Sequence, residues 1–366
     1  MFGDVYSGQK VLVTGHTGFK GSWLCLWLLE LGAEVVGFSH DIPTNPSIFS
    51  DLNLSEKVND YRGDIRDLSL LNEVIHNEKP DFIFHLAAQP IVSESYYDPV
   101  GTITTNAIGT MNIMEILRKI DWPCSVVLIT SDKSYDNVEW VWGYKETDPV
   151  GGKDIYSGSK GAAELIIKSY YHSFFEGKKH NARIAVARAG NVIGGGDWAK
   201  DRIVVDCMKA WSIGESVEIR CPNATRPWQH VLEPLSGYLT LGHMVKYSDH
   251  LIGEAFNFGP RSEQNRTVIE LLNDLFRESK IDKAETPFIV TDNIPFKESG
   301  LLKLNCDKAM FNLKWEAALD YEKTVNFTAD WYSKYYLDKK DIHKFTIQQI
   351  RQYVEIAKEK LFVWTV

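Results

Sequence analysis

Tyr156 and Lys160 are the residues of this 366-residue chain whose types and spacing first suggest a reaction. They are four positions apart in a segment with helical spacing, so their side chains would share one face of a helix. A tyrosine can act as a base only if its pKa falls well below about 10, and a nearby ammonium group lowers it. The pair therefore predicts proton transfer at a hydroxyl group.

The spacing alone is not specific, because it recurs in Tyr6/Lys10, Tyr335/Lys339 and Tyr336/Lys340. Only the pair at 156 and 160 follows the fifth predicted strand, from which its helix can face a bound dinucleotide. We expect the other three pairs to lie on the solvated surface.

Ser131, Asp132 and Lys133 follow the apolar run that ends at Thr130. In a parallel sheet this strand end points into the ligand crevice. There Ser131 could bind a substrate hydroxyl, and Asp132 could serve as an acid or hold one in position. Alternatively, Asp132 and Lys133 are an ordinary loop pair, an interpretation that the downstream tyrosine–lysine helix makes the weaker one.

A glycine-rich loop runs from Thr14 to Gly21, between the first strand and the first helix. Gly15 would permit a tight turn, Gly18 a close approach of a pyrophosphate to the backbone, and Gly21 the packing of the helix against the sheet. The helix N-terminus would offer N–H groups to phosphates. This context predicts a dinucleotide site, against the alternative of a simple turn.

The end of the second strand bears on the choice between NAD and NADP. Asp41 could accept a hydrogen bond from the ribose 2′-hydroxyl, and the segment has no arginine for a 2′-phosphate, which favours NAD; Asp41 could equally be a turn residue. After the next strand, Asp64 could bind the adenine amino group with Ile65 against the ring. Alternatively, Asp64 belongs to a helix N-cap pair.

The elements that position these residues alternate along the first half of the chain. We expect strands at 11–14, 34–38, 81–86, 125–130 and 183–187, another strand before Gly63, and helices at 24–31, 68–77, 100–118 and 156–175. Gly32 would end the first helix. This alternation predicts an α/β fold: a Rossmann-type, doubly wound parallel sheet with helices on both faces.

After Gly190 this rhythm breaks into loops and shorter helices. We expect a Rossmann domain over 1–190, to which later segments can return, and a smaller C-terminal α/β substrate domain mainly over 191–320. A helical segment over 321–366 would follow.

The composition is that of an ordinary globular protein, with 44% hydrophobic residues and a net charge of −9. This charge argues against nucleic acids and anionic membranes as partners. The five cysteines form no CxxC pair, so we expect free thiols, no metal site and a cytoplasmic location. We see no signal peptide and no membrane span.

Several longer motifs resemble the extended short-chain dehydrogenases/reductases, and among them the CDP-glucose 4,6-dehydratases. They cover nearly the whole chain: Thr14–Trp23, His85–Gln89, Ser131–Tyr135, the segment with Trp140 and Trp142, Gly151–Ser157, Arg188–Trp198 and Thr225–Pro234. The resemblance implies NAD as cofactor. The residues that it places at the cofactor, besides those argued above, are His16, Thr17, Phe19, Leu86, Ala87, Ala88 and Asn106.

The resemblance also implies a lyase reaction on CDP-glucose, with loss of water and no net redox change, in deoxysugar and surface (O-antigen) polysaccharide synthesis. Tyr156 would take the 4-hydroxyl proton as hydride passes from C4 to NAD, and the ketone would acidify C5. Asp132 would protonate the departing 6-hydroxyl, and hydride would return to C6. Lys160 would lower the pKa of the tyrosine and hold the nicotinamide ribose. Lys133 replaces the glutamate of the dTDP-glucose branch, either as the C5 base or as a cation that stabilises the enolate.

The nucleotide sugar needs cations and amide donors. We expect Gln89, Asn191, Arg202, Arg226 and Arg266 at the substrate, with Arg226 supported by its motif; surface ion pairs are the alternative for Arg202 and Arg266. Trp198 and Trp228 would stack near the base or pack in the core. Residues 297–299 stand where the resemblance leads us to expect a His-Glu-Ala stretch.

The resemblance implies a homodimer through the helices near 100–118 and 156–175, where Ile108, Ile116, Ile166 and Ile167 could pack between subunits or in the core. Two other functions remain open. The first is another sugar-nucleotide dehydratase or an epimerase, which would need Tyr156 and Lys160. The second is a non-catalytic dinucleotide-binding regulator, which would not need that pair.

Overall fold

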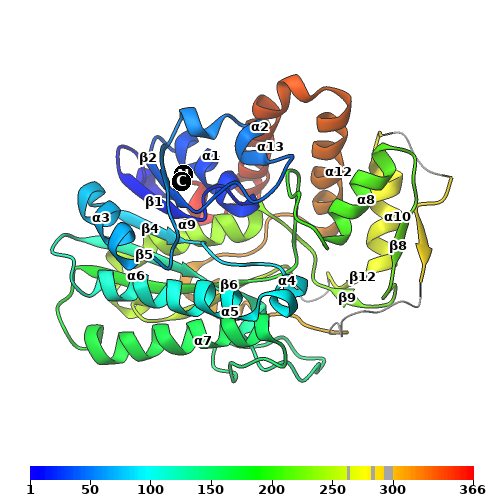
Figure 1. The fold of residues 1–366 in the computed structure, drawn as a ribbon. Helices are drawn as coiled ribbons and strands as arrows, with labels where there is room; N and C mark the ends of the chain where they lie inside the picture. Colours follow the sequence, from blue (N-terminus) through cyan, green and yellow to red (C-terminus); the bar gives the residue numbers. More distant parts are fainter. Residues whose placement is uncertain (262–263, 282–284, 292–299) are drawn as a thin grey trace.

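A computed structural model describes residues 1–261, 264–281, 285–291 and 300–366. Its centre is a seven-stranded sheet in the order β11-β6-β5-β4-β1-β2-β3, in which neighbouring strands are parallel (Figure 1). The strands are β1 (Lys10–Thr14), β2 (Glu34–Ser39), β3 (Asn59–Arg62), β4 (Phe82–His85), β5 (Cys124–Ile129), β6 (Ala182–Ala189) and β11 (Ala255–Phe258). The predicted doubly wound sheet is confirmed, and its strand order reverses between β1 and β4, where such sheets open their ligand crevice.

Helices cover both faces of this sheet (Figure 1). Alternate residues of β1 show why: Val11 and Val13 pack in one core cluster, and Leu12 packs in the other. Helices α1, α9 and α13 contribute to the first cluster, and α3, α6 and α7 to the second. Their bounds are α1 (Phe19–Glu30), α3 (Leu68–Glu78), α6 (Gly109–Leu117), α7 (Ile155–Tyr170), α9 (Leu232–Tyr247) and α13 (Ile342–Glu359).

Two of the predicted helices are interrupted by π-helical turns, which often mark functional sites. The segment predicted over 100–118 consists of α5 (Pro99–Ile103), the π-helical turn η3 (Thr104–Ile108) and α6. The helix predicted over 156–175 ends in a second such turn, η5 (Tyr171–Phe175). The η3 turn contains Asn106, one of the predicted site residues.

The later chain returns to the sheet. Helix α9 packs on β5 and β6, and β11 forms the edge of the sheet beside β6. Both lie within the range 191–320 that we assigned mainly to the substrate domain. β11 was not predicted because it is short and contains a buried asparagine, Asn257, whose amide donates to the carbonyls of Tyr144 and Asn305.

The smaller part of the molecule lies to the right in Figure 1, around α8 and α10. Besides the central sheet, the described residues form three two-stranded sheets: the parallel pairs β7–β10 and β8–β13, and the antiparallel pair β9–β12. The strands are β7 (Val192–Ile193), β8 (Val217–Ile219), β9 (Thr225–Arg226), β10 (Gln229–His230), β12 (Arg266–Thr267) and β13 (Phe288–Val290). The remaining helices are α2 (Ile48–Asp51), α4 (Val92–Tyr97), α8 (Ile203–Ser212), α10 (Val268–Glu278), α11 (Asp307–Leu313) and α12 (Tyr321–Leu337).

The two ends of the chain meet on the surface beside α1 (Figure 1). The backbone N–H of Gly3 donates to the Val366 carbonyl at 2.9 Å, and the ring of Phe2 stacks on Trp364 with centroids 5.2 Å apart. Among the described helices, none combines the length and the apolar character that crossing a bilayer requires.

Candidate active site

The glycine loop has the shape that a bound pyrophosphate requires. Gly15 has φ +75°, and a Cβ on it would lie 2.8 Å from the backbone nitrogen of Ala87. Gly18 is the N-cap of α1 and gives the helix no side-chain cap, so its first N–H groups are left for a ligand. A Cβ on Gly21 would lie 2.1 Å from the Gly15 carbonyl oxygen, so the absence of a side chain lets α1 approach the backbone that leaves β1.

His16 does not point toward the space above the loop. Its ring is buried over Gly37, with Nδ1 2.8 Å from the Ser39 hydroxyl and Nε2 2.9 Å from Asp60. Thr17 donates to the Asp41 carbonyl at 2.6 Å. These two side chains therefore fix the loop to β2 and β3, while Phe19 opens α1.

The residues predicted at the adenosine end lie beyond β2 and β3. The Asp41 side chain is 69% exposed beside His40. The Asp64 carboxylate is held by the Arg66 guanidinium, with 2.5 Å between Oδ2 and Nη2, and Ile65 packs in the core against Gly109. Asp67, and not Asp64, is the N-cap of α3.

Residues 86–89 leave the end of β4 beside the glycine loop. The backbone N–H groups of Leu86 and Ala87 donate to the carbonyl and hydroxyl of Thr14, and Ala88 follows them. Asn106 is buried, and its amide binds both backbone groups of Gln89 as well as the Ser159 hydroxyl. Asn106 thus fixes the backbone of Gln89 by hydrogen bonds to both its N–H and its carbonyl.

Ser131, Asp132 and Tyr156 are brought together at the carboxyl end of β5. The Ser131 hydroxyl donates to Asp132 Oδ1 at 2.9 Å, and a hydrogen bond between Ser131 and Tyr156 partly opposes the burial that raises the pKa of this tyrosine. Asn191, after β6, donates to Asp132 Oδ2 at 3.3 Å, so its amide contacts the predicted acid. A Cβ on Gly190 would lie 1.9 Å from the same oxygen, which leaves the carboxylate little freedom. Lys133 is half-buried beside this group.

The expected low pKa of Tyr156 is not found. Burial raises the pKa of this tyrosine to about 12, and Arg202 is the main charge that opposes the rise. Lys160 is also buried; desolvation, together with the charge of Lys20, lowers its pKa to about 8. Tyr156 and Lys160 both lie on α7, but burial sets the tyrosine pKa, and Arg202 rather than Lys160 is the cation that acts on it.

Two cations, Lys20 and Arg202, face this cluster, and Lys20 was not among the predicted site residues. Lys20, in the first turn of α1, lies with Nζ 3.5 Å from the Tyr238 hydroxyl, and burial and the charge of Arg202 lower its pKa to about 8. A lysine near a helix N-terminus opposes the helix dipole, a signal that could have identified it. Arg202, the N-cap residue of α8, donates to the Pro90 carbonyl and lies close enough to oppose the pKa rise of Tyr156.

The other tyrosine–lysine pairs are not all on the surface, contrary to our expectation. Tyr6 is buried and donates to the Leu239 carbonyl. Tyr335 is buried under Trp198 and accepts from Lys339 at 2.9 Å.

Arg226 and Arg266 are cross-strand partners in the β9–β12 pair. Arg226 donates to the carbonyls of Thr225 and Gly300, and the Arg266 guanidinium lies 5.1 Å from the centre of the Tyr321 ring. Like charges directly opposite each other destabilise a strand pair. Trp198 and Trp228 are buried in the larger core cluster, as the packing alternative expects. Residues 297–299 lie outside the described residues.

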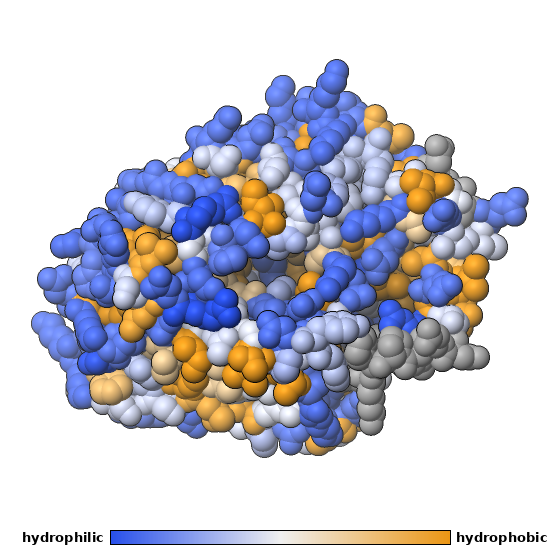
Figure 2. All heavy atoms as spheres, in the orientation of Figure 1, coloured by the Kyte–Doolittle hydropathy of each residue, from blue (hydrophilic) through white to orange (hydrophobic). Residues whose placement is uncertain are grey.

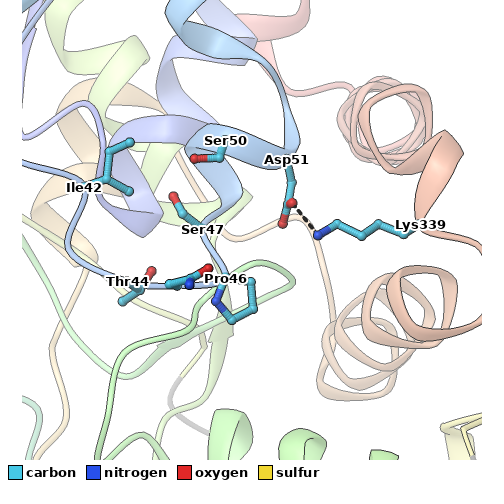
Figure 3. Close-up of a pocket in the computed structure, with 8 residues that line it drawn as sticks. Ile42, Thr44, Pro46, Ser47, Ser50, Asp51 and Lys339 are labelled. Carbon is cyan, nitrogen blue, oxygen red and sulfur yellow. Dashed lines mark ion pairs between the residues drawn. The ribbon is translucent and has the colours of Figure 1, made fainter.

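A cavity of about 320 Å³ lies beyond β2, between residues 42–51 and the end of α12 (Figure 3). The ion pair of Asp51 and Lys339 closes one side at 2.7 Å. The predicted catalytic residues do not line it. Among the described residues, no group of three or more acidic, cysteine or histidine side chains could hold a metal ion.

The sequence is similar to those of known sugar-nucleotide dehydratases. Residues 12–328 match the GDP-mannose 4,6 dehydratase family. The chain is 44% identical to CDP-glucose 4,6-dehydratase of Salmonella typhimurium over 332 residues, which cover 90% of the chain and 92% of that protein. This chain belongs to the GDP-mannose 4,6 dehydratase family.

Other sugar-nucleotide enzymes are less similar in sequence. CDP-paratose 2-epimerase of Salmonella typhi is 26% identical over 89% of the chain and 99% of that protein. Among solved structures, dTDP-glucose 4,6-dehydratase of Bacillus anthracis in complex with NAD superposes with a TM-score of 0.70 at 22% identity, covering 89% of this chain and 97% of that one. This structural likeness supports the Rossmann-type fold.

Proposed function

We propose that this chain is an NAD-dependent CDP-glucose 4,6-dehydratase, which forms CDP-4-dehydro-6-deoxyglucose for deoxysugar synthesis. The observation that carries the proposal is the convergence of Tyr156, Ser131 and Asp132 at the carboxyl end of β5. The 44% identical relative with that name supports the choice of reaction and nucleotide. An epimerase would need the tyrosine and lysine but no acid at a leaving hydroxyl.

The loop between β1 and α1 fits a dinucleotide, since its glycines clear the backbone and the N-terminus of α1 lacks a side-chain cap. Bound NAD supplies a group that accepts a hydride from the sugar and returns it within the same turnover. Asp41 would bind the adenosine ribose, and Lys160 the nicotinamide ribose.

The residues at the end of β5 would move the protons. Tyr156 takes the proton of the sugar 4-hydroxyl while Ser131 donates to the same oxygen, and Asp132 protonates the 6-hydroxyl as it leaves as water. The C5 proton goes either to Lys133 or to another base, with Lys133 then stabilising the enolate. Arg202, beside Tyr156, favours the phenolate.

Replacement of Lys133 by alanine separates these two roles. If Lys133 is the base, we expect the rate of exchange of the substrate C5 proton with deuterated solvent to fall by about 10²-fold or more, and added small amines to restore it in part. Mass spectrometry of recovered substrate measures the exchange. Lys145→Ala, on the neighbouring loop, should leave it unchanged, and unaltered turnover of Lys133→Ala would remove the residue from the mechanism.

Arg226 and Arg266 would hold the substrate diphosphate between β9 and β12. We expect Arg226→Ala and Arg266→Ala each to raise KM for CDP-glucose about tenfold, since a charge-assisted hydrogen bond contributes roughly 1.5 kcal/mol or more. Steady-state kinetics measures this. Arg261→Ala removes only an exposed ion pair with Glu316 and should leave KM unchanged. Equal KM values for all three variants would contradict the assignment.

A panel of nucleoside-diphosphate hexoses tests the function itself. The purified chain should convert CDP-glucose, in preference to the dTDP, GDP and UDP compounds, to a 4-keto-6-deoxy product that absorbs light after addition of alkali. Epimerised product, or turnover of another nucleotide, would identify a different member of the group. Binding of NAD without turnover of any hexose would indicate a regulator.

We also propose that the chain acts as a homodimer in the cytoplasm. Large apolar side chains are exposed on α5 and α7, namely Val100, Ile103 and Leu165. Figure 2 shows hydrophobic atoms gathered on the lower part of this face of the molecule. Ile108 is exposed and Ile166 half-buried, whereas Ile116 and Ile167 are core residues and not available to a partner. Leu165→Glu should halve the mass found by light scattering; a monomeric unsubstituted chain would contradict the proposal.

The proposed location in the cytoplasm agrees with the state of the cysteines. All five cysteines are free, as a reducing compartment allows.

A further inference from the structure

A buried ion pair lies directly beneath the catalytic groups. Glu164 and Arg188 are only 6% and 5% exposed, and their side chains meet twice, with Oε1 to Nε at 2.8 Å and Oε2 to Nη2 at 2.9 Å. Burying two charges costs desolvation energy that their attraction often fails to offset, so such a pair is weak evidence for stability. Its place in the fold suggests another role.

The pair connects three segments that carry site residues. Glu164 is four residues after Lys160 on α7, and its Oε1 accepts a hydrogen bond from Thr130, the residue before Ser131. Arg188 lies two residues before Gly190, which touches Asp132, and its Nη1 donates to Tyr135 at 2.7 Å. The ends of β5 and β6 are thereby tied to the helix of the tyrosine and lysine.

We infer that Glu164 and Arg188 are positioning residues for the proposed dehydration: their ion pair holds the strand ends of Asp132 and Asn191 against α7 and supplies the counter-charge of Lys160. The inference rests on the proposed function. Neither residue is assigned to touch the substrate, so both act through their neighbours.

The electrostatic part has a definite sign. The charged groups that act on Lys160 are Glu164 on its own helix and Lys20 on α1, and Lys160 itself acts on His85 at the end of β4. Tyr156 lies one turn before Lys160 on α7, and Arg188 lies on the other side of Glu164. Burial and Lys20 lower the pKa of Lys160 to about 8, and Glu164 is the group that raises it. Without the carboxylate the pKa falls further, so the ammonium form is lost at a lower pH.

The test uses a double variant, Glu164→Gln with Arg188→Met, which leaves no unpaired buried charge and keeps an acceptor for Thr130. We expect a folded protein with a thermal midpoint close to that of the unsubstituted chain, kcat reduced by about tenfold or more and KM within about twofold. Because the double variant removes one negative and one positive charge, Glu164→Gln alone tests the charge: the alkaline limb of its kcat profile should move to lower pH by about one unit. Glu176→Gln, which removes an exposed carboxylate beyond the end of α7, should change none of these.

A folded double variant with unchanged kcat would overturn the positioning role. Glu164→Asp and Glu164→Gln decide the charge effect: the aspartate should keep the alkaline limb in place and the glutamine should move it, and equal profiles would overturn the counter-charge role. The pH dependence of Lys160 modification by an amine reagent, followed by mass spectrometry, gives the same comparison without turnover. Inactivity of the unsubstituted chain toward CDP-glucose would refute the proposed function, while the modification result would still test the ion pair.

Discussion

Replacement of Tyr156 by phenylalanine is expected to reduce the turnover of CDP-glucose by about 10³-fold, the scale of a lost acid–base group. The ring would keep its buried position, so the loss would come from the phenolic oxygen alone. Steady-state measurement of the 4-keto product gives kcat, and KM should change little, because the phenol acts on the proton and not on the diphosphate.

The chain offers a matched control for this substitution. Tyr335 is also buried, and its hydroxyl accepts a hydrogen bond from a lysine four residues later. Tyr335→Phe removes the same atom from the same sequence pattern on α12, and we expect full activity. If the Tyr156→Phe enzyme has the same kcat as the control, Tyr156 is not the group that takes the proton of the 4-hydroxyl.

Replacement of Asp132 by asparagine is expected to reduce product formation by about 10²-fold to 10⁴-fold while exchange of the C5 proton continues. The amide matches the carboxylate in shape, and its oxygen can still accept from Asn191, but it cannot donate a proton to the leaving hydroxyl. Comparison of product rate with solvent-deuterium incorporation at C5 separates the two steps.

Asp136→Asn provides the control, since Asp136 is exposed on the loop that follows the same strand. Loss of both exchange and product in Asp132→Asn would mean that the carboxylate is needed before water leaves. Product formation close to that of the control would assign the acid to another residue.

Local patterns predicted much of the fold. The first helix ends as expected, because α1 stops at Glu30 and Gly32 adopts φ +77°. The strands at 125–130 and 183–187 were placed within a residue or two of β5 and β6. Each rests on a signal within a few neighbours: a left-handed glycine or a run of apolar residues.

The features that were not predicted depend on contacts between residues far apart in the sequence. The pairing of β11 with β6 joins Phe258 to Ala189, and a four-residue strand with a buried asparagine gives no local sign of it. The raised pKa of Tyr156 is set by burial, which spacing to Lys160 does not report. The proximity of Lys20 to Tyr238 joins the first helix to α9, more than two hundred residues later.

The contact of residues 2–3 with residues 364–366 makes this chain suited to circular permutation. A backbone hydrogen bond and a ring stack already hold these two segments together. A short glycine–serine linker could therefore join residue 366 to residue 1 in a permuted gene. New ends could then open in the exposed turn around Gly177, between η5 and β6, where added atoms meet nothing within 4 Å. Such a permuted chain would be translated with α7 and β6 at opposite ends, and would still have to assemble the same crevice.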